Sequence, residues 1–205
     1  MYRKVKQLKV MKQFVCIVVF SLIYISGFSQ LDFFTRGQSK AKMKDYKGAI
    51  IEYDKALELH PDSAQIFLYR GNAQYNLNEF VGALIDYNKA IKLNAKYAEA
   101  YINRGNAENN LKEYTEAIAD YNRAIELNPK NAEAYFYRAN VKSIINDYKG
   151  AIVDFTVAIK LKPGYIEAYT NRGNARNNLH DVDGACSDWN KASKLLSNQI
   201  IERDN

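Results

Sequence analysis

A 34-residue repeat is the feature that most constrains the fold of this chain. The motif Arg-Gly-Asn-Ala begins at Arg70, Arg104 and Arg172, and Arg138-Ala-Asn-Val fills the gap in the same register. This register divides most of the chain into five contiguous units, at residues 30–63, 64–97, 98–131, 132–165 and 166–199. A unit of this length cannot bury an apolar face alone, so neighbouring units are expected to stack into one continuous core.

The positions within each unit indicate two helices. Positions 4, 8, 11 and 14 fall on one stripe of a first helix, and positions 20, 24, 27 and 28 fall on one stripe of a second. Positions 20 and 27 are Ala in every unit, whereas position 24 is aromatic: Tyr53, Tyr87, Tyr121, Phe155 and Trp189. Small residues let two helix backbones approach closely, and aromatic rings fill the space beside them. The sequence therefore predicts an all-α fold, an α-solenoid of five helix-turn-helix repeats.

Over residues 30–199 this pattern resembles the tetratricopeptide repeat (TPR) family, and the resemblance implies a right-handed α-solenoid. Two positions depart from the family pattern, which usually has Leu at position 7 and Tyr at position 11. Position 7 is always Arg: Arg36, Arg70, Arg104, Arg138 and Arg172. Position 23 is always acidic: Glu52, Asp86, Asp120, Asp154 and Asp188. Because the two positions lie at similar heights in an antiparallel helix pair, we predict an Arg–carboxylate pair in every unit, within the repeat or across the junction, with a structural role.

Residues 1–29 are typical of a secretory signal peptide. Five basic residues precede a 12-residue apolar run, Phe14 to Ile25, and the small residues Ser26, Gly27 and Ser29 follow. We expect cleavage after Ser29 and a periplasmic or secreted mature protein of bacterial type. The alternative is an inner-membrane anchor formed by residues 14–28, which is short for a membrane span. Residues 200–205 are expected to form a C-terminal tail.

The charge distribution and the sparse reactive residues exclude several classes of function. The chain carries a net charge of +6, but all five charges of residues 1–29 are basic, so the remainder is nearly neutral. A nucleic-acid reader would keep a basic surface, so this class is a less favoured alternative. No catalytic motif, metal-ligand cluster or phosphate-binding loop is present, so we predict no enzyme activity, no metal and no cofactor. Cys186 occupies a position that is Ile or Leu in the other units, and we expect it to be a small core residue.

In the TPR family, the stripe at positions 2, 5, 6, 9, 12 and 13 of the first helices lines a concave groove that binds extended peptides. Position 9 is asparagine in four successive units: Asn72, Asn106, Asn140 and Asn174. Asn103, Asn171, Tyr69, Tyr137 and Phe136 lie on the same stripe, and position 5 offers the apolar residues Phe34, Leu68 and Ile102. An amide both donates and accepts hydrogen bonds, so such a ladder can pair with any peptide backbone. The alternative is that these asparagines only solvate the face or bond between repeats.

These observations predict a non-catalytic protein–protein interaction scaffold that binds an extended peptide or a partner protein in its concave groove. The identity of the partner stays open. An alternative is an assembly subunit that uses the ends of the solenoid. Ser193 replaces a branched apolar residue of the other units, yet Ile200 and Ile201 follow it, and solenoid ends normally need polar caps. We therefore also predict weak self-association.

Overall fold

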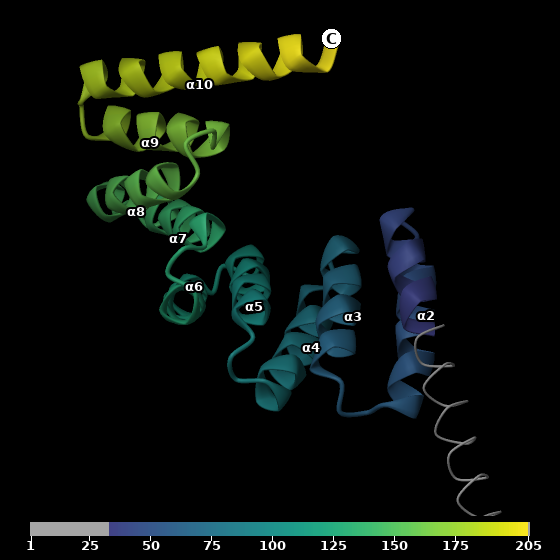
Figure 1. Ribbon diagram of the computed structural model, residues 1–205. Helices are drawn as coiled ribbons and strands as arrows, with labels where there is room; N and C mark the ends of the chain where they lie inside the picture. Colours follow the sequence, from purple (N-terminus) through teal and green to yellow (C-terminus); the bar gives the residue numbers. More distant parts are fainter. Residues whose placement is uncertain (1–32, 205) are drawn as a thin grey trace, which may run out of the picture. The chain divides into compact units, whose positions relative to one another are not determined.

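The structure, a computed structural model, describes residues 33–204, and this part of the chain is helical throughout with short connecting turns (Figure 1). Residues 33–42 are helical. The helices that follow are α2 (Tyr46–Leu59), α3 (Ala64–Asn76), α4 (Phe80–Leu93), α5 (Ala98–Asn110), α6 (Tyr114–Leu127), α7 (Ala132–Ile144), α8 (Tyr148–Leu161), α9 (Ile166–Asn178) and α10 (Val182–Asp204). Each predicted unit holds two successive helices, so the all-α solenoid fold is confirmed. The predicted leader, residues 1–29, lies outside the described residues.

The chain divides into two compact units, Met1–Glu79 and Phe80–Asn205. In the first, α2 packs against α3. In the second, helices of the same repeat pack as pairs, α5 on α6, α7 on α8 and α9 on α10, and the repeats join through α4 on α5, α6 on α7 and α8 on α9. Each helix therefore packs mainly against its neighbours in the sequence, as the repeat pattern predicts.

A recurring turn connects the two helices of each repeat. Position 15 has a positive φ of 61° to 66° in every repeat, at Lys44, Asn78, Lys112, Asn146 and His180. A carboxylate then caps the second helix in three repeats, where Asp45, Asp147 and Asp181 accept hydrogen bonds from the backbone N–H groups of Gly48, Gly150 and Gly184. A Cβ at any of these glycines would lie 2.1–2.2 Å from the capping carboxylate, so a larger residue there would force the carboxylate to move. The repeat at 98–131 differs, because Glu113 makes no such bond and Glu116 stands where these repeats have glycine.

A small residue at position 8 lets the aromatic residue at position 24 pack inside each repeat. The rings of Tyr53, Tyr121 and Phe155 are almost completely buried. A Cβ on Gly105 would lie 2.9 Å from Tyr121 Cε1. In the repeat at 132–165, Ala139 takes the place of the glycine and the ring opposite is Phe155. The contact between the two helices therefore depends on the residues at both positions.

The arginines at position 7 bind the acids at position 23 in each repeat whose two helices lie in one unit. Arg104 donates to Asp120 from Nε and from Nη2, at 2.6 Å in both cases. The same two-pronged geometry joins Arg138 to Asp154 and Arg172 to Asp188, at 2.6–2.9 Å. In the first repeat, Arg36 Nε lies 3.2 Å from Glu52. Arg70 and Asp86 belong to different units.

The third guanidinium nitrogen, Nη1, reaches across the junction to position 25 of the preceding repeat. Its partners are Asp54 for Arg70, Asn88 for Arg104, Asn122 for Arg138 and Thr156 for Arg172, at 2.5–3.0 Å. Each guanidinium also lies over the ring at position 4 of its own helix, 5.5–5.6 Å from the ring centre. A planar group with five donors suits this position, because it joins two helices of one repeat and two successive repeats at once.

The last described helix differs from the sequence-based prediction in two ways. Residues 200–204, expected to be a tail, continue α10, which has 23 residues where the other second helices have 14. The prediction that Cys186 is a core residue is wrong, because this cysteine is exposed. Its counterparts Ile118 and Ile152 are partly buried, on helices that the next repeat covers. Within the described residues no helix follows α10, so Cys186 contacts solvent. Self-association stays a prediction.

Candidate functional site

The asparagines at position 9 are already bonded within the scaffold. Asn106 Oδ1 accepts a hydrogen bond from the Tyr121 hydroxyl at 2.7 Å, and Asn174 Oδ1 accepts one from Trp189 Nε1 at 3.2 Å. Each donor lies at position 24 of the repeat that contains its asparagine. Part of the predicted ladder therefore serves the helix pairs, and a ligand would mainly meet the amide Nδ2 groups of these residues.

Asn140 has a different partner. Its repeat has Phe155 at position 24, which offers no hydrogen-bond donor, and its Oδ1 instead accepts from Asn171 Nδ2 of the next repeat at 2.8 Å. This bond joins α7 to α9 on their common face. Two of the predicted groove residues are thus brought together directly.

The asparagines at position 13 are also engaged. The Nδ2 groups of Asn76, Asn110 and Asn178 donate to the backbone carbonyls of Asn72, Asn106 and Asn174, one helical turn earlier, at 2.7–2.9 Å. Such bonds compete with the helix's own hydrogen bonds and help to hold each side chain on the helix surface. Each of these bonds uses one of the two Nδ2 hydrogens. Asn103 is half-buried and also takes part in an interaction.

An open groove lies where Asn140 and Asn171 meet. It has a volume of about 420 Å³ and is lined by Asn140, Ser143, Ile144, Tyr148, Asn171, Asn174, Ala175 and Asn178. The lining comes from α7, α9 and the start of α8, and none of these side chains carries a charge. Ser143 Oγ is buried and has no hydrogen-bond partner among the described residues. The groove therefore presents neutral polar groups beside a few apolar ones, which suits a backbone segment better than a charged ligand.

The predicted apolar pockets at position 5 are filled by the protein itself. Leu68 and Ile102 are buried in the core, so they do not line a groove. Phe136 is half-buried against the ring of Tyr165, with ring centres 4.7 Å apart. The expected pockets at Leu68 and Ile102 are absent because both side chains are buried. Phe136 keeps part of its ring exposed, and its contact with a ligand stays a prediction.

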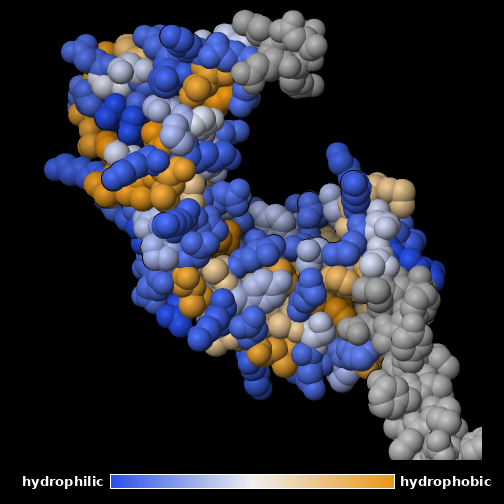
Figure 2. Space-filling model, in the orientation of Figure 1, coloured by the Kyte–Doolittle hydropathy of each residue, from blue (hydrophilic) through white to orange (hydrophobic). Residues whose placement is uncertain are grey.

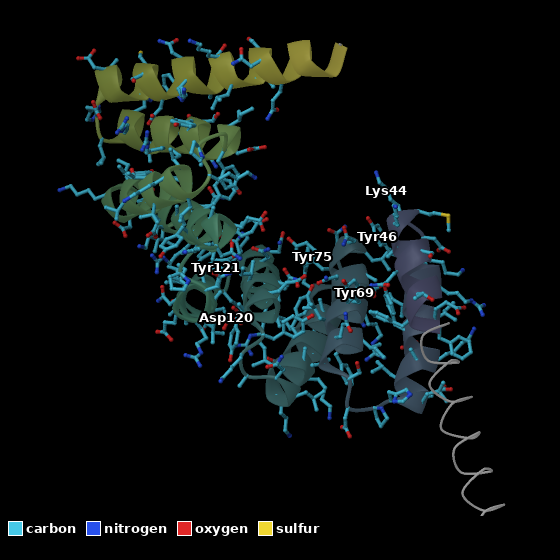
Figure 3. All side chains as sticks on the ribbon, viewed as in Figure 1. Lys44, Tyr46, Tyr69, Tyr75, Asp120 and Tyr121 are labelled. Atoms are coloured by element: carbon cyan, nitrogen blue, oxygen red, sulfur yellow. The ribbon has the colours of Figure 1, made fainter. Side chains whose placement is uncertain are left out.

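The predicted groove tyrosines lie at the edges of the aromatic core. Tyr137 stacks on Tyr121 with ring centres 6.1 Å apart, and Tyr69 meets Phe34 edge to face at 5.2 Å. Figure 3 labels Tyr69 on α3 and Tyr121 on α6. Both tyrosines remain half-buried, so one side of each ring can meet a ligand. Desolvation, with Tyr69 nearby, raises the pKa of the buried Tyr53 to about 12, so this core hydroxyl stays protonated.

Acidic side chains occupy position 2 of the later repeats. Burial raises the pKa of the Glu99 carboxyl, and the negative charge of Glu133 one repeat further adds to the shift. Two carboxylates of successive repeats therefore lie close enough to repel each other. Figure 2 shows that hydrophilic residues cover most of the visible face, with apolar residues scattered between them.

Residues 33–204 contain no group of three metal-binding side chains, and no helix in this range combines the length and apolar character needed to cross a membrane.

The comparisons with known proteins agree with this architecture. Models of the tetratricopeptide repeat match residues 98–131 and 120–153, and a TPR repeat model matches residues 37–78. A comparison with curated proteins finds no match. A crystal structure of MamA is 29% identical, with a TM-score of 0.74 over 80% of this chain and 96% of that chain. The TPR domain of Arabidopsis OM64 is 28% identical, with a TM-score of 0.56 over 58% of this chain and 98% of that chain.

YrrB, described as a TPR protein with an unusual peptide-binding site, shares the fold at 21% identity, with a TM-score of 0.66 over 80% of this chain and 84% of that chain. Family models match at three places along the chain, and the neighbouring structures share the helix-pair architecture. Together they support a protein-interaction scaffold. The chain belongs to the tetratricopeptide repeat family.

Proposed function

We propose that this protein is a non-catalytic scaffold that binds an extended segment of a partner protein in the groove between α7 and α9. The observation that carries the proposal is the groove itself, whose lining includes Asn140, Asn171, Asn174 and Asn178 and no charged side chain. The amide hydrogens there can donate to backbone carbonyls whatever the side chains of the bound segment. Because each such bond contributes only about 1 kcal/mol net, affinity depends on several of them acting together.

The acidic side chains at position 2 support a preference for basic segments. Glu99 and Glu133 repel each other in the free protein, and a Lys or Arg of the ligand would relieve that repulsion. Residues 1–29 support a further proposal, that the scaffold acts outside the cytoplasm.

Site-specific photo-crosslinking tests the location of the groove. A benzophenone amino acid replaces Ile144, which lines the groove and is 50% exposed, or Val153 on α8, which is 62% exposed and does not line it. Peptides selected on the full chain from a random display library are expected to crosslink at position 144 and not at position 153. Equal yields at the two positions, or crosslinking at 153 alone, would contradict the proposal.

Titration of the crosslinked peptides tests the role of the amides. Asn171→Ala removes a groove amide, and Asn198→Ala on α10 is the matched control, since Asn198 is exposed and does not line the groove. We expect about fivefold weaker binding for the first variant and no change for the second, because one hydrogen bond is lost. Unchanged affinity for both would show that the amides do not contact the ligand.

A further inference from the structure

Position 11 places a second charge beside the buried carboxylate of each Arg–acid pair in the last three repeats. In the repeat at 132–165, Lys142 Nζ lies 2.8 Å from Asp154 Oδ2. In the repeat at 166–199, Arg176 Nη1 lies 2.9 Å from Asp188 Oδ2. Both carboxylates thus have two cations. The repeat at 98–131 has Glu108 at this position, so the sign of the charge is reversed.

Glu108 is almost completely buried without a strong partner. It is 8% exposed, and its Oε2 has no hydrogen-bond partner among the described residues. Its other oxygen is 3.8 Å from Arg104 Nε, which already donates to Asp120 at 2.6 Å. The Arg104 guanidinium therefore lies near two buried carboxyl groups, and its hydrogen bonds go to Asp120 and not to Glu108.

Three acids and one cation act directly on the charge of Glu108. Asp120 and Glu116 on α6 and Glu113 just before it act on Glu108 as negative charges, and Arg104 on α5 is the opposing cation. The helices packed on the other sides of α5 carry Asp86, Lys89 and Lys92 on α4 and Glu133, Arg138 and Lys142 on α7. Of these, Arg138 and Lys142 are bonded to Asp154. Burial, and next the charge of Asp120, raise the pKa of the Glu108 carboxyl to about 7.

We propose that Glu108 makes the repeat at 98–131 a pH-responsive joint, in which α5 and α6 pack firmly while this carboxyl is protonated and loosen when it ionises. A protonated carboxyl can be buried at small cost, whereas an ionised one without a partner favours any opening that returns it to water. The folded-state pKa lies above that of the unfolded chain. The stability contribution is therefore complete below the usual pKa of glutamate, declines as the pH rises to about 7, and is constant above that.

Hydrogen exchange of the full chain at pH 5 and pH 8, corrected for the intrinsic rate at each pH, measures the proposed opening. We expect the opening constant of α5 and α6 to rise on the order of fiftyfold between these values, and that of α7 and α8 to change far less. Glu108→Gln, which cannot ionise, should abolish the rise. Glu116→Gln is the matched control, since Glu116 is exposed and acts only as a neighbouring charge. It should retain most of the rise.

Three results would overturn the proposal. The first is an equal pH dependence in the wild type and Glu108→Gln, and the second is an equal response of α5–α6 and α7–α8. The third is a carbon-13 titration in which the Glu108 carboxyl of the wild type ionises in the ordinary range of glutamate, and this measurement does not depend on the folding of any variant.

Discussion

The repeats at 98–131 and 132–165 share one frame but use it differently. Both have an arginine that holds a buried aspartate with two nitrogens and a neutral asparagine of the preceding repeat with the third. Among the positions where they differ, three matter here: Gly105, Glu108 and Tyr121 of the first correspond to Ala139, Lys142 and Phe155 of the second. The invariant pair holds the helices together, and the variable positions decide the local charge and the direction of the groove amides.

The loss of one hydroxyl has an effect on the groove. In the repeat at 98–131 the Tyr121 hydroxyl donates a hydrogen bond to the amide oxygen of Asn106. In the repeat at 132–165 Phe155 has no hydroxyl, and the amide oxygen of Asn140 accepts a hydrogen bond from Asn171 of the next repeat. The bond between α7 and α9 lies in the wall of the groove. A core substitution therefore determines how a surface amide is used.

The largest expected difference between the two repeats is their tolerance to loss of the buried aspartate. Asp154→Ala leaves Arg138 and Lys142 without their shared carboxylate, so we expect a loss of about 3–5 kcal/mol in the free energy of unfolding. Asp120→Ala should cost about 1–2 kcal/mol, because Glu108 can then pair with Arg104 and loses a repelling neighbour. Urea unfolding at pH 8 measures both. Equal losses would show that position 11 does not affect the pair.

A smaller effect is expected at position 8. Gly105→Ala places a Cβ 2.9 Å from Tyr121 Cε1, and we expect a loss of about 1–2 kcal/mol because the ring must move away from its bond with Asn106. The double variant Gly105→Ala with Tyr121→Phe copies the repeat at 132–165. It should lose less than the sum of the two single changes in thermal unfolding, since the ring is then free to shift. Strict additivity would indicate that the two positions are independent.

The smallest effect concerns the hydroxyl alone. Tyr121→Phe removes the bond to Asn106 Oδ1, and we expect a loss of about 1 kcal/mol in urea unfolding. Phe155→Leu serves as a control for ring packing, since Phe155 makes no hydrogen bond through its side chain. A cost for Tyr121→Phe near zero would mean that Asn106 finds another donor.

The repeat pattern was sufficient to predict the helices and the Arg–acid pairs, because both depend on residue types that recur in register. Arg104 and Asp120 are the plainest case, since each residue type appears in all or nearly all units. The partner of Nη1 was not predicted. Position 25 holds Asp, Asn and Thr in different repeats, and only the structure shows that one donor meets all three.

The groove was predicted less well for a physical reason. Position 9 carries asparagine in four units, and the same pattern results whether an amide binds a ligand or a neighbouring tyrosine. The residue at position 24 could have separated the two. Tyr121 donates a hydrogen bond to Asn106, whereas Phe155 has no donor for Asn140, which binds Asn171 instead. Leu68 and Ile102 were assigned to pockets, although both side chains are buried in the core.

The spacing of the arginine contacts bears on how such a chain can lengthen or shorten during evolution. Arg104, Arg138 and Arg172 each bind one residue sixteen positions later and one residue sixteen positions earlier. Duplication or deletion of a whole 34-residue block restores both spacings at every new boundary, wherever the block is cut. An insertion or deletion of any other length within a helix pair separates a guanidinium from its buried carboxylate and incurs the cost of an unpaired charge. The charge pairing therefore favours duplications and deletions of 34 residues and selects against insertions and deletions of other lengths.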